Sequence, residues 1–451
     1  MSSSIYLSAA HKSSGKTVVS LGLCAAFKAK LLNVQAFKKG PDYIDPIWLS
    51  QASGNPCYNL DFYNMPESEI IALYRQYTSQ SDIAIIEGNK GLYDGMSTTG
   101  GDANADMAKL LDTSVILVID ATGITRGVAP LLSGYQAFDQ EVTIAGVILN
   151  KVAGERHESK LVQAIEHYTD IPVVGAIRRS KELIIDERHL GLMPANETPE
   201  SQSFIDRAAK HITDQVDLSA LLTSNQITIK SSPLVVNNAT KALTVAVAKD
   251  SAFGFYYPDD LNAFESLGVD LVYFDTLTDA QLPKADALFI GGGFPEMQLD
   301  ALSENQSLLS DIKTKIEAGL PTYAECGGLM YLSRQITHQG KTHKMVGVIE
   351  ADTLMTPKPI GRGYVQLAPT NKHPWNEVAE QISAHEFHYS KLENLDPKTH
   401  YAYKVLRGVG VDNKRDGILK HNLLATYSHL RNVGGNHWVE QFVNFIKDKQ
   451  K

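Results

Sequence analysis

One cysteine stands where a predicted strand turns sharply into a predicted helix. Cys326 follows an apolar segment that ends at Ala324 and Glu325, and it is followed directly by Gly327 and Gly328. A nucleophile on such a turn needs small neighbours, because the backbone is strained and closely approached. The N–H groups that open the following helix favour a thiolate over a thiol. A buried structural cysteine is the alternative, but two glycines at a helix start cost stability without any packing gain. The pattern therefore favours a nucleophilic cysteine.

A cysteine nucleophile needs a histidine base, and the sequence offers several after Cys326. His429 closes one predicted strand, whereas His385 and His388 lie in another segment. Chemistry alone favours His429 only modestly over His388, and each could be an ordinary core or surface histidine. A glycine run, Gly291–Gly293, follows the predicted strand at 287–290. Its backbone N–H groups could point at an oxyanion, although a flexible turn is the alternative.

A second kind of chemistry is indicated near the N-terminus. Gly15, Lys16 and Thr17 lie between a predicted strand and a predicted helix, as at the end of a phosphate-binding loop. In such a loop, backbone N–H groups hold the phosphates, the lysine reaches the β- and γ-oxygens, and the hydroxyl ligates Mg²⁺. The full consensus is not met, because Ala10 stands at its first glycine. The Gly-Lys-Thr triplet alone is a weak signal, and its strand–loop–helix setting strengthens it.

Charged side chains follow two further predicted strands. Lys38 and Lys39 close one strand, and Asp42 and Asp45 follow on a turn-rich loop suited to phosphate and metal. Glu87 ends the buried strand at 83–87, where parallel sheets place their ligands, so we expect it to hold Mg²⁺. A solvated polar turn is the alternative for the lysine and aspartate loop.

These residues must be positioned by alternating strands and helices. Near-continuous apolar strands are predicted at 5–7, 83–87, 114–120, 142–150 and 173–177, and again at 243–248 and 287–290. Loops and helical patterns separate them, as in doubly wound, mostly parallel sheets. The Ser, Pro and Asn residues near 231–238 interrupt the pattern and predict a linker. We therefore expect an α/β protein of two units.

Composition bounds the class of protein. A chain of 451 residues is too long for one ordinary core, and 43% hydrophobic with 21% charged residues is typical of a globular protein. A formal charge of −9 argues against general binding to nucleic acid or to an anionic membrane. Three dispersed cysteines fit no zinc spacing and no disulfide framework, which favours the reducing cytoplasm. No apolar run approaches the length of a membrane span.

Eight motifs occur in an order that resembles the cobyrinic acid a,c-diamide synthase family. They are KKGPDYIDP, EGNKGLYDGM, ERHLGL, FGFYYPDDL, GGGFPEMQLDAL, YAECGGLMYL, AHEFHYS and ATYSHL. The resemblance spans essentially the whole chain. It implies a P-loop amidoligase domain similar to dethiobiotin synthetase at 1–232, a linker at 233–242 and a class I-like glutamine amidotransferase domain at 243–447. It further implies that ATP, Mg²⁺ and glutamine serve to amidate the a- and c-acetates of a corrinoid precursor.

The resemblance also implies roles for particular residues. It makes Cys326 the glutaminase nucleophile and His429 its activating base, with oxyanion donors from the glycine loop and the turn. It places ATP and Mg²⁺ on the first loops, and we expect the tetrapyrrole beside them. We expect the following residues in these roles: as oxyanion donors Gly292, Gly293 and Gly327; as ATP-binding residues Gly15, Lys16, Thr17 and Lys38; as metal ligands Thr17, Asp45 and Glu87; and as substrate contacts Asp42, Tyr43, Trp48, Tyr93 and Asp94.

Three departures from the family pattern keep alternatives open. Ala10 and Ser13 occupy P-loop positions where glycine is expected, and Arg431 stands where triad amidotransferases carry a glutamate. Trp48 and the segment 102–106 also differ near the expected tetrapyrrole. Sirohaem is therefore a second candidate substrate, and an ATP-dependent partitioning protein without amidation is a third reading. A homodimer is an assembly that the sequence leaves open.

Overall fold

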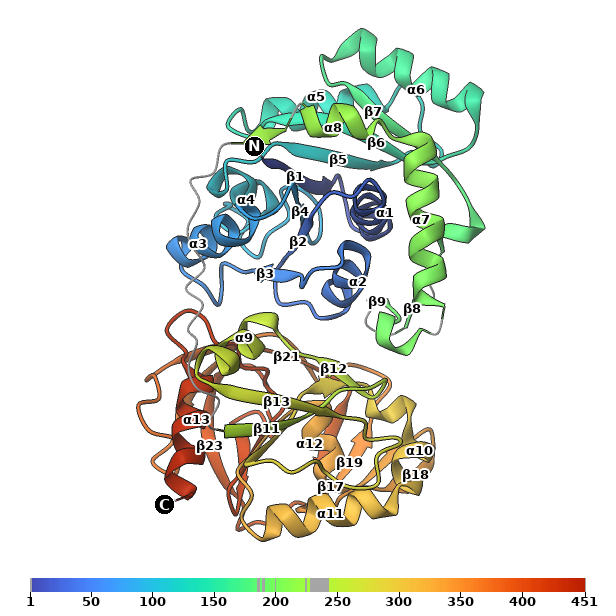
Figure 1. Cartoon of the computed structure of the whole chain (residues 1–451). Helices are drawn as coiled ribbons and strands as arrows, with labels where there is room; N and C mark the ends of the chain where they lie inside the picture. The colour runs from blue at the N-terminus through green and yellow to red at the C-terminus, as the bar shows by residue number, and fades with distance from the viewer. Residues whose placement is uncertain are drawn as a thin grey trace. The chain divides into compact units, whose positions relative to one another are not determined.

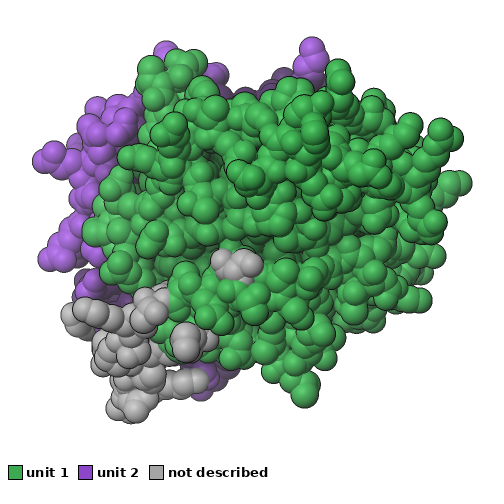
Figure 2. All heavy atoms as spheres, turned by 90° about the horizontal axis from the view of Figure 1, so that it is seen from above, with its two compact units in different colours: residues 1–234 green, residues 235–451 purple. Residues whose placement is uncertain are grey.

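The chain divides into two compact units, which we call the N-terminal unit, residues 1–234, and the C-terminal unit, residues 235–451 (Figures 1 and 2). The predicted linker at 233–242 lies outside the described residues, and so does part of the ERHLGL motif. No helix within the described ranges is long and apolar enough to cross a membrane. The computed structural model describes residues 2–184, 187–188, 191–198, 200–223, 225–227 and 243–450.

The N-terminal unit alternates strands with helices. Its strands are β1 (Ser2–Ala9), β2 (Val34–Lys39), β3 (Tyr58–Leu60), β4 (Ile83–Glu87), β5 (Val115–Asp120), β6 (Ile144–Val152), β7 (Val173–Arg178), β8 (Glu187–Arg188), β9 (Gly191–Leu192) and β10 (Gln226–Ile227). Its α-helices are α1 (Lys16–Ala29), α2 (Ile44–Ser53), α3 (Glu67–Thr78), α4 (Asn104–Leu110), α5 (Val128–Phe138), α6 (Glu155–Tyr168), α7 (Ser201–Gln215) and α8 (Leu218–Thr223).

The sheet of this unit brings three functional loops to one edge. Its order is β3-β2-β4-β1-β5-β6-β7, all parallel, with β10 pairing antiparallel to β1. β2 and β4 are buried along their whole length, as expected where helices cover both faces. Figure 1 shows α1, α2 and α7 on one side of these strands and α3 and α4 on the other. Because β2, β4 and β1 are neighbours, their carboxyl-end loops lie together.

The C-terminal unit is richer in strands. They are β11 (Leu243–Ala248), β12 (Phe253–Phe255), β13 (Val269–Phe274), β14 (Ala287–Ile290), β15 (Gly292–Gly293), β16 (Thr322–Glu325), β17 (Ser333–His338), β18 (Lys341–Lys344), β19 (Ile349–Met355), β20 (Gly361–Pro369), β21 (Ile382–His388), β22 (Ser390–Glu393), β23 (His400–Arg407), β24 (Arg415–Lys420) and β25 (Leu423–Thr426). Its α-helices are α9 (Pro258–Ser266), α10 (Leu299–Glu304), α11 (Gln306–Glu317), α12 (Gly327–Leu332) and α13 (Trp438–Lys449).

The large sheet of this unit is half parallel and half antiparallel. Its order is β13-β11-β14-β16-β25-β24-β23-β20-β21, and pairing is parallel from β13 to β25 and antiparallel beyond. Alternate residues of β11 enter different core clusters, with Val245 and Val247 in one and Ala246 and Ala248 in the other. Both faces are therefore buried. The fold class predicted from the sequence is confirmed, whereas the antiparallel half was not predicted.

Candidate active sites

Cys326 occupies the turn between β16 and α12 with a strained backbone. Its φ of 48° and ψ of −101° lie in a region that non-glycine residues rarely adopt. The turn is held by the Cys326 N–H, which donates to the carbonyl oxygen of Thr426 at 2.7 Å. A Cβ added at Gly328 would stand 2.4 Å from the Ile290 carbonyl oxygen, so helix and strand can approach only through a glycine. The sharp turn predicted from the sequence is thus present.

His429 follows β25 and faces the cysteine. It is 2% exposed, and its N–H donates to the His385 carbonyl oxygen at 2.7 Å. Burial on its own lowers the pKa of His429, but attraction and hydrogen bonding to Cys326, together with the Glu325 carboxylate, outweigh it and raise the pKa to about 10. The arrangement favours an imidazolium beside the sulfur, which is the charge state that stabilises a thiolate.

The other candidate histidines make different contacts. His388 hydrogen-bonds through Nδ1 to the Ser390 carbonyl oxygen at 2.8 Å and stacks on Tyr427, with ring centroids 3.9 Å apart. His385 stacks on His429 with centroids 4.9 Å apart, and burial lowers its pKa well below the usual value. Of the two histidines that chemistry alone left open, His429 has the interaction with Cys326 that a base would need, so His429 stays the predicted base.

Glu325 is a site residue that sequence reasoning missed. Its Oε2 lies 3.4 Å from His429 Nδ1, and the carboxyl group is 2% exposed. Its Oε1 accepts hydrogen bonds from the Tyr323 hydroxyl at 2.6 Å and from the Leu430 N–H at 2.8 Å. The available signal was a carboxylate at the end of an otherwise apolar strand, directly before the nucleophile.

Arg431 stands where triad amidotransferases carry a glutamate, and its guanidinium contacts residues at the start of α9. Its guanidinium donates to Asp259 from Nε at 2.7 Å and lies 4.9 Å from the centroid of the Tyr257 ring. The Asn432 N–H beside it donates to Asp260 at 2.7 Å. These contacts tie the segment after His429 to the first turn of α9, so Arg431 fixes the loop through an acidic partner of its own.

The glycine loop lies against both catalytic candidates. A Cβ at Gly292 would stand 2.5 Å from His429 Cε1, and a Cβ at Gly327 would stand 3.1 Å from the Gly293 nitrogen. The loop therefore approaches the nucleophile as predicted. Gly291 is different, because its N–H donates to the Tyr256 hydroxyl at 2.9 Å. Of the glycine run considered as a source of oxyanion donors, Gly291 therefore has its N–H already engaged, and the predicted donors stay Gly292, Gly293 and Gly327.

The N-terminal loop has the curved backbone of a phosphate cradle. Ser13 and Gly15 both take positive φ values, 67° and 87°. Asn150 closes over the loop, because its Nδ2 donates to the Ser14 carbonyl oxygen at 2.9 Å and would stand 2.2 Å from a Cβ at Gly15. Lys151 supports the same loop by donating to the Ser13 carbonyl oxygen at 3.0 Å. Serine thus accepts the left-handed conformation that glycine usually supplies.

Four of the predicted nucleotide and metal residues form one cluster. Lys38 Nζ lies 2.7 Å from Glu87 and also pairs with Asp45, while the Thr17 hydroxyl donates to Glu87 at 2.9 Å. Burial opposes the charge on Lys38, but these carboxylates outweigh it and raise its pKa well above the usual value. Lys16 lies beside the cluster with Nζ 2.7 Å from the Lys90 carbonyl oxygen, and burial lowers its pKa to about 8.

The donor set of this cluster fits Mg²⁺ bound together with phosphate. The described residues contain no ready group of three His, Cys, Asp or Glu side chains for a metal. Thr17, Asp45 and Glu87 nevertheless offer hard oxygen atoms, and the buried Glu87 Oε2 has no hydrogen-bond partner among the described residues. Mg²⁺ often takes only one or two carboxylates and completes its shell with phosphate and water.

The predicted substrate residues divide into two groups. Asp42 lies 3.7 Å from Lys38, and Tyr43 precedes α2 next to it. Asp94 accepts the Gly91 N–H at 3.1 Å, and the adjacent Tyr93 donates to the Tyr135 carbonyl oxygen at 2.9 Å. Both loops are on the edge where the carboxyl ends of β1, β2 and β4 lie. These four residues therefore lie on the same edge of the sheet as the predicted nucleotide site.

Trp48 was placed wrongly among the substrate residues. It is 0% exposed, and its indole N–H donates to the Met193 carbonyl oxygen at 2.8 Å. Its ring packs on Phe204, with centroids 5.7 Å apart. An indole enclosed between α2 and α7 presents no face to a ligand, so Trp48 is a core residue.

The two aspartates of the divergent segment shape their own loop. Asp102 accepts the N–H groups of Met96 and Ser97, and Asp106 accepts those of Gly101 and Ala103, all between 2.7 and 3.2 Å. A carboxylate that satisfies two backbone donors is fixed by its loop. These side chains therefore have a structural use that does not require a substrate.

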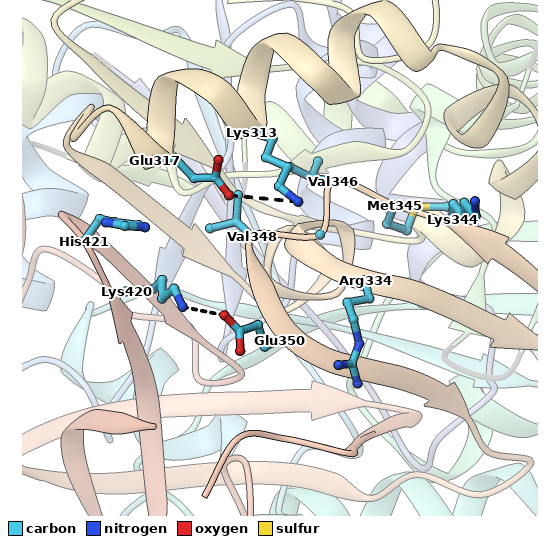
Figure 3. A pocket seen from close by; sticks show the side chains of 11 residues that line it. Lys313, Glu317, Arg334, Lys344, Met345, Val346, Val348, Glu350, Lys420 and His421 are labelled. Atoms are coloured by element: carbon cyan, nitrogen blue, oxygen red, sulfur yellow. Dashed lines mark hydrogen bonds and ion pairs between the residues drawn. The ribbon is translucent and has the colours of Figure 1, made fainter. Parts of the chain in front are cut away.

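A pocket of about 710 Å³ lies elsewhere in the C-terminal unit (Figure 3). Two pairs of opposite charges lie in its lining: Lys420 is 2.6 Å from Glu350, and Lys313 is 3.9 Å from Glu317 one turn along α11. Its lining contains none of the predicted site residues. Its lining residues are Lys313, Glu317, Arg334, Lys344, Met345, Val346, Gly347, Val348, Glu350, Lys420 and His421.

Comparison with known proteins identifies both units. Residues 9–192 match the CobQ/CobB/MinD/ParA nucleotide binding domain, and residues 244–436 match the CobB/CobQ-like glutamine amidotransferase domain. The chain is 43% identical to the cobyrinate a,c-diamide synthase of Magnetococcus marinus, over 99% of this chain and 97% of that protein. It is 37% identical to the enzyme of the same name from Caldanaerobacter subterraneus, over 96% of each. It is 38% identical to that from Methanosarcina acetivorans, over 95% of this chain and 92% of the relative.

Proposed function

The chain belongs to the cobyrinate a,c-diamide synthase family, and we propose from this that it converts the a- and c-acetate carboxylates of cobyrinic acid to carboxamides in cobalamin biosynthesis. Glutamine is the nitrogen donor and ATP supplies the energy. The observation that carries the proposal is the meeting of Cys326 with His429 in the same chain as the P-loop unit. A P-loop partitioning protein has no use for such a pair, which disfavours that alternative.

The C-terminal unit releases ammonia from glutamine. The Cys326 thiolate attacks the side-chain amide carbon, and the C–N bond breaks as His429 gives its proton to the departing nitrogen. The N–H groups of Gly292, Gly293 and Gly327 stabilise the oxyanion of the intermediate. Water activated by His429 then cleaves the thioester, which frees glutamate and restores the thiol group.

The N-terminal unit activates the acetate. A carboxylate oxygen of the substrate attacks the γ-phosphorus of ATP and ADP leaves, so that an acyl phosphate forms. Lys16 and the loop N–H groups offset the charge on the transferring phosphoryl group. Mg²⁺, held by Thr17, Asp45 and Glu87, would neutralise phosphate charge when bound. Ammonia then attacks the acyl carbon and phosphate departs, which leaves the amide.

Substrate identity is proposed from the family. Trp48 and the segment 102–106 were the grounds for considering sirohaem, and both have structural explanations in the core and in the loop. No observation on the described residues now favours sirohaem over cobyrinic acid. Asp42, Tyr43, Tyr93 and Asp94 remain the proposed contacts of the tetrapyrrole, because they flank the nucleotide loop.

A direct test gives the purified protein both tetrapyrroles in separate reactions with ATP, Mg²⁺ and glutamine. Mass spectrometry should show two carboxylate-to-amide conversions on cobyrinic acid, and omission of ATP should abolish them. A higher kcat/KM for sirohaem would overturn the substrate assignment. Absence of amide on both rings, in a preparation that still hydrolyses glutamine, would overturn the proposed ligase reaction.

A further inference from the structure

We propose that Glu325 is the positioning residue of the glutaminase site, holding His429 in orientation and stabilising its protonated form. This inference rests on the proposed glutamine hydrolysis. It assigns to the residue directly before the nucleophile the role that a glutamate after the histidine has in triad amidotransferases. The chain therefore carries a Cys326–His429–Glu325 arrangement in which two of the three members are consecutive.

The Glu325 carboxylate is fixed before it meets the histidine. Both hydrogen bonds to Oε1, from the Tyr323 hydroxyl and the Leu430 N–H, are between 2.6 and 2.8 Å long. Oε2 is thereby turned toward His429 Nδ1, 3.4 Å away. A carboxylate held from one side by two donors loses little further freedom in holding an imidazole. Its contacts are those expected of an orienting group.

Backbone pairing between strands fixes the relative positions of Glu325, Cys326 and His429. β16 and β25 are adjacent parallel strands, and Glu325 is in register with Thr426. His429 comes three residues after Thr426 and is pinned by its main-chain bridge to His385. The proposed nucleophile and the orienting carboxylate thus come from the end of β16. The proposed base comes from the loop that follows the neighbouring strand, β25. Elements of a rigid sheet position a site more accurately than long loops do.

The charged groups around His429 show why the Glu325 carboxylate matters for the protonated form of the imidazole. The groups facing it are Cys326 from the turn, Glu325 from β16 and His385 from β21, with Arg431 two residues along. Burial keeps His385 neutral by lowering its pKa, and Arg431 is balanced by Asp259. Glu325 is then the fixed negative charge beside the imidazolium. Its removal should make the thiolate–imidazolium pair less stable relative to neutral thiol and imidazole.

The Glu325 carboxylate should also affect the pH range over which the site is active. A thiolate–imidazolium pair exists above the pKa of the cysteine and below that of the histidine. Loss of the carboxylate should lower the pKa of His429, so the alkaline limit of the active pH range should move to lower pH. A shift of one pH unit corresponds to about a tenfold change in the population of the charged form. Damage to the fold alone would lower activity without moving this limit.

The test compares wild type with Glu325→Gln, Glu325→Asp and Tyr323→Phe. Two quantities are followed against pH: kcat/KM for glutamate release from glutamine, and the rate of alkylation of Cys326 by iodoacetamide, read on its own peptide by mass spectrometry. Glu325→Gln should lower kcat/KM at neutral pH by up to roughly 10⁴-fold, the loss that follows removal of the orienting carboxylate from a Ser-His-Asp triad. The alkaline limit of its kcat/KM profile should move to lower pH.

The other variants keep the proposal falsifiable if Glu325→Gln does not fold. Glu325→Asp retains the charge at a longer reach, and Tyr323→Phe removes one donor to Oε1, so each should show a smaller shift in the same direction. Glu386→Gln is the matched control, since Glu386 is also 2% exposed and accepts two backbone N–H groups, of Val409 and Gly410. Its pH limits should stay at the wild-type positions.

The outcomes separate this inference from the proposed function. If wild type releases no glutamate from glutamine, the proposed function fails. If wild type is active and the alkaline limit of folded Glu325→Gln matches wild type, the proposed function stands and the role of Glu325 is refuted. Equal shifts in Glu325→Gln and Glu386→Gln would also refute it, because they would reflect buried charge in general.

Discussion

Each candidate site contains a non-glycine residue with a positive φ. Cys326 has a φ of 48°, and Ser13 and Gly15 in the P-loop have 67° and 87°. Non-glycine residues pay about 1–2 kcal/mol for left-handed backbone, so such positions persist only where surrounding contacts impose them. At Cys326 the contact is with Thr426, and at Ser13 it is with Lys151. These hydrogen bonds hold the strained backbone in the conformation that each candidate site needs.

The P-loop yields the first prediction. Gly15→Ala should reduce ATP-dependent amidation by about 10²-fold or more, because its Cβ would collide with Asn150 and distort the phosphate cradle. Ser13→Gly is the contrasting variant, since it keeps the same φ and should change the KM for ATP by less than about tenfold. Steady-state kinetics with ammonium as nitrogen donor isolates this step. A large loss in Ser13→Gly with little loss in Gly15→Ala would contradict the loop geometry.

Residue-level prediction from the sequence succeeded where local pattern and chemistry coincide. The glycines after Cys326 indicated the turn because few other roles explain two adjacent glycines at a helix start. Glu325 was missed because its partner, His429, is brought near only by pairing of β16 with β25. Trp48 was misplaced because an aromatic residue near a ligand loop has the same sequence signature whether it faces the ligand or the core.

At the scale of elements, the site at Cys326 depends on close approach between α12 and β14. Gly328→Ala should destabilise the C-terminal unit by roughly 1–3 kcal/mol, because the new Cβ would overlap the Ile290 carbonyl oxygen. Thermal unfolding and glutamine hydrolysis should both be impaired. Gly134→Ala is the control: this helical glycine in α5 has nothing within 4 Å, so alanine should be neutral or stabilise by up to ~1 kcal/mol. Unchanged stability in Gly328→Ala would contradict the tight packing of α12 on β14.

Packing between α2 and α7 gives a second prediction at this scale. Trp48→Ala should cost about 3–5 kcal/mol of stability, because it empties a fully buried site. The ratio of kcat/KM for cobyrinic acid to that for sirohaem should not change. Tyr168→Ala, at a side chain 52% exposed, should stay within about 0.5 kcal/mol of wild type by urea unfolding. A changed substrate ratio at unchanged stability would restore Trp48 to the substrate site.

Strands buried on both faces were the most predictable elements. Continuous apolar runs such as those of β4 and β5 are typical of parallel strands in α/β units, and these were found where expected. The antiparallel strands β20, β23 and β24 were not predicted. They mix buried and exposed positions with many polar residues, so their pairing depends on distant partners in the sheet. Local pattern carries little information about such pairing.

At the scale of the whole molecule, each unit has its own sheet and its own candidate chemistry. The C-terminal core is anchored by α13, whose Trp438 contacts Tyr323 and Phe289 directly under the catalytic strand. Full burial of each such side chain contributes roughly 1.5–3 kcal/mol. A lesion in the glutaminase site should therefore leave the N-terminal chemistry intact, and the two half-reactions can be separated by mutation.

The most direct test of the two-site account follows the nitrogen atom. Wild type is incubated with cobyrinic acid, ATP, Mg²⁺ and glutamine labelled with heavy nitrogen in its amide, with and without unlabelled ammonium, beside Cys326→Ala. Wild type should place the label in both new amides. Cys326→Ala should form no product from glutamine, yet should form unlabelled diamide with ammonium at raised pH, because free ammonia bypasses the cysteine. Label in the product of Cys326→Ala, or no rescue of folded Cys326→Ala by ammonium, would contradict the account.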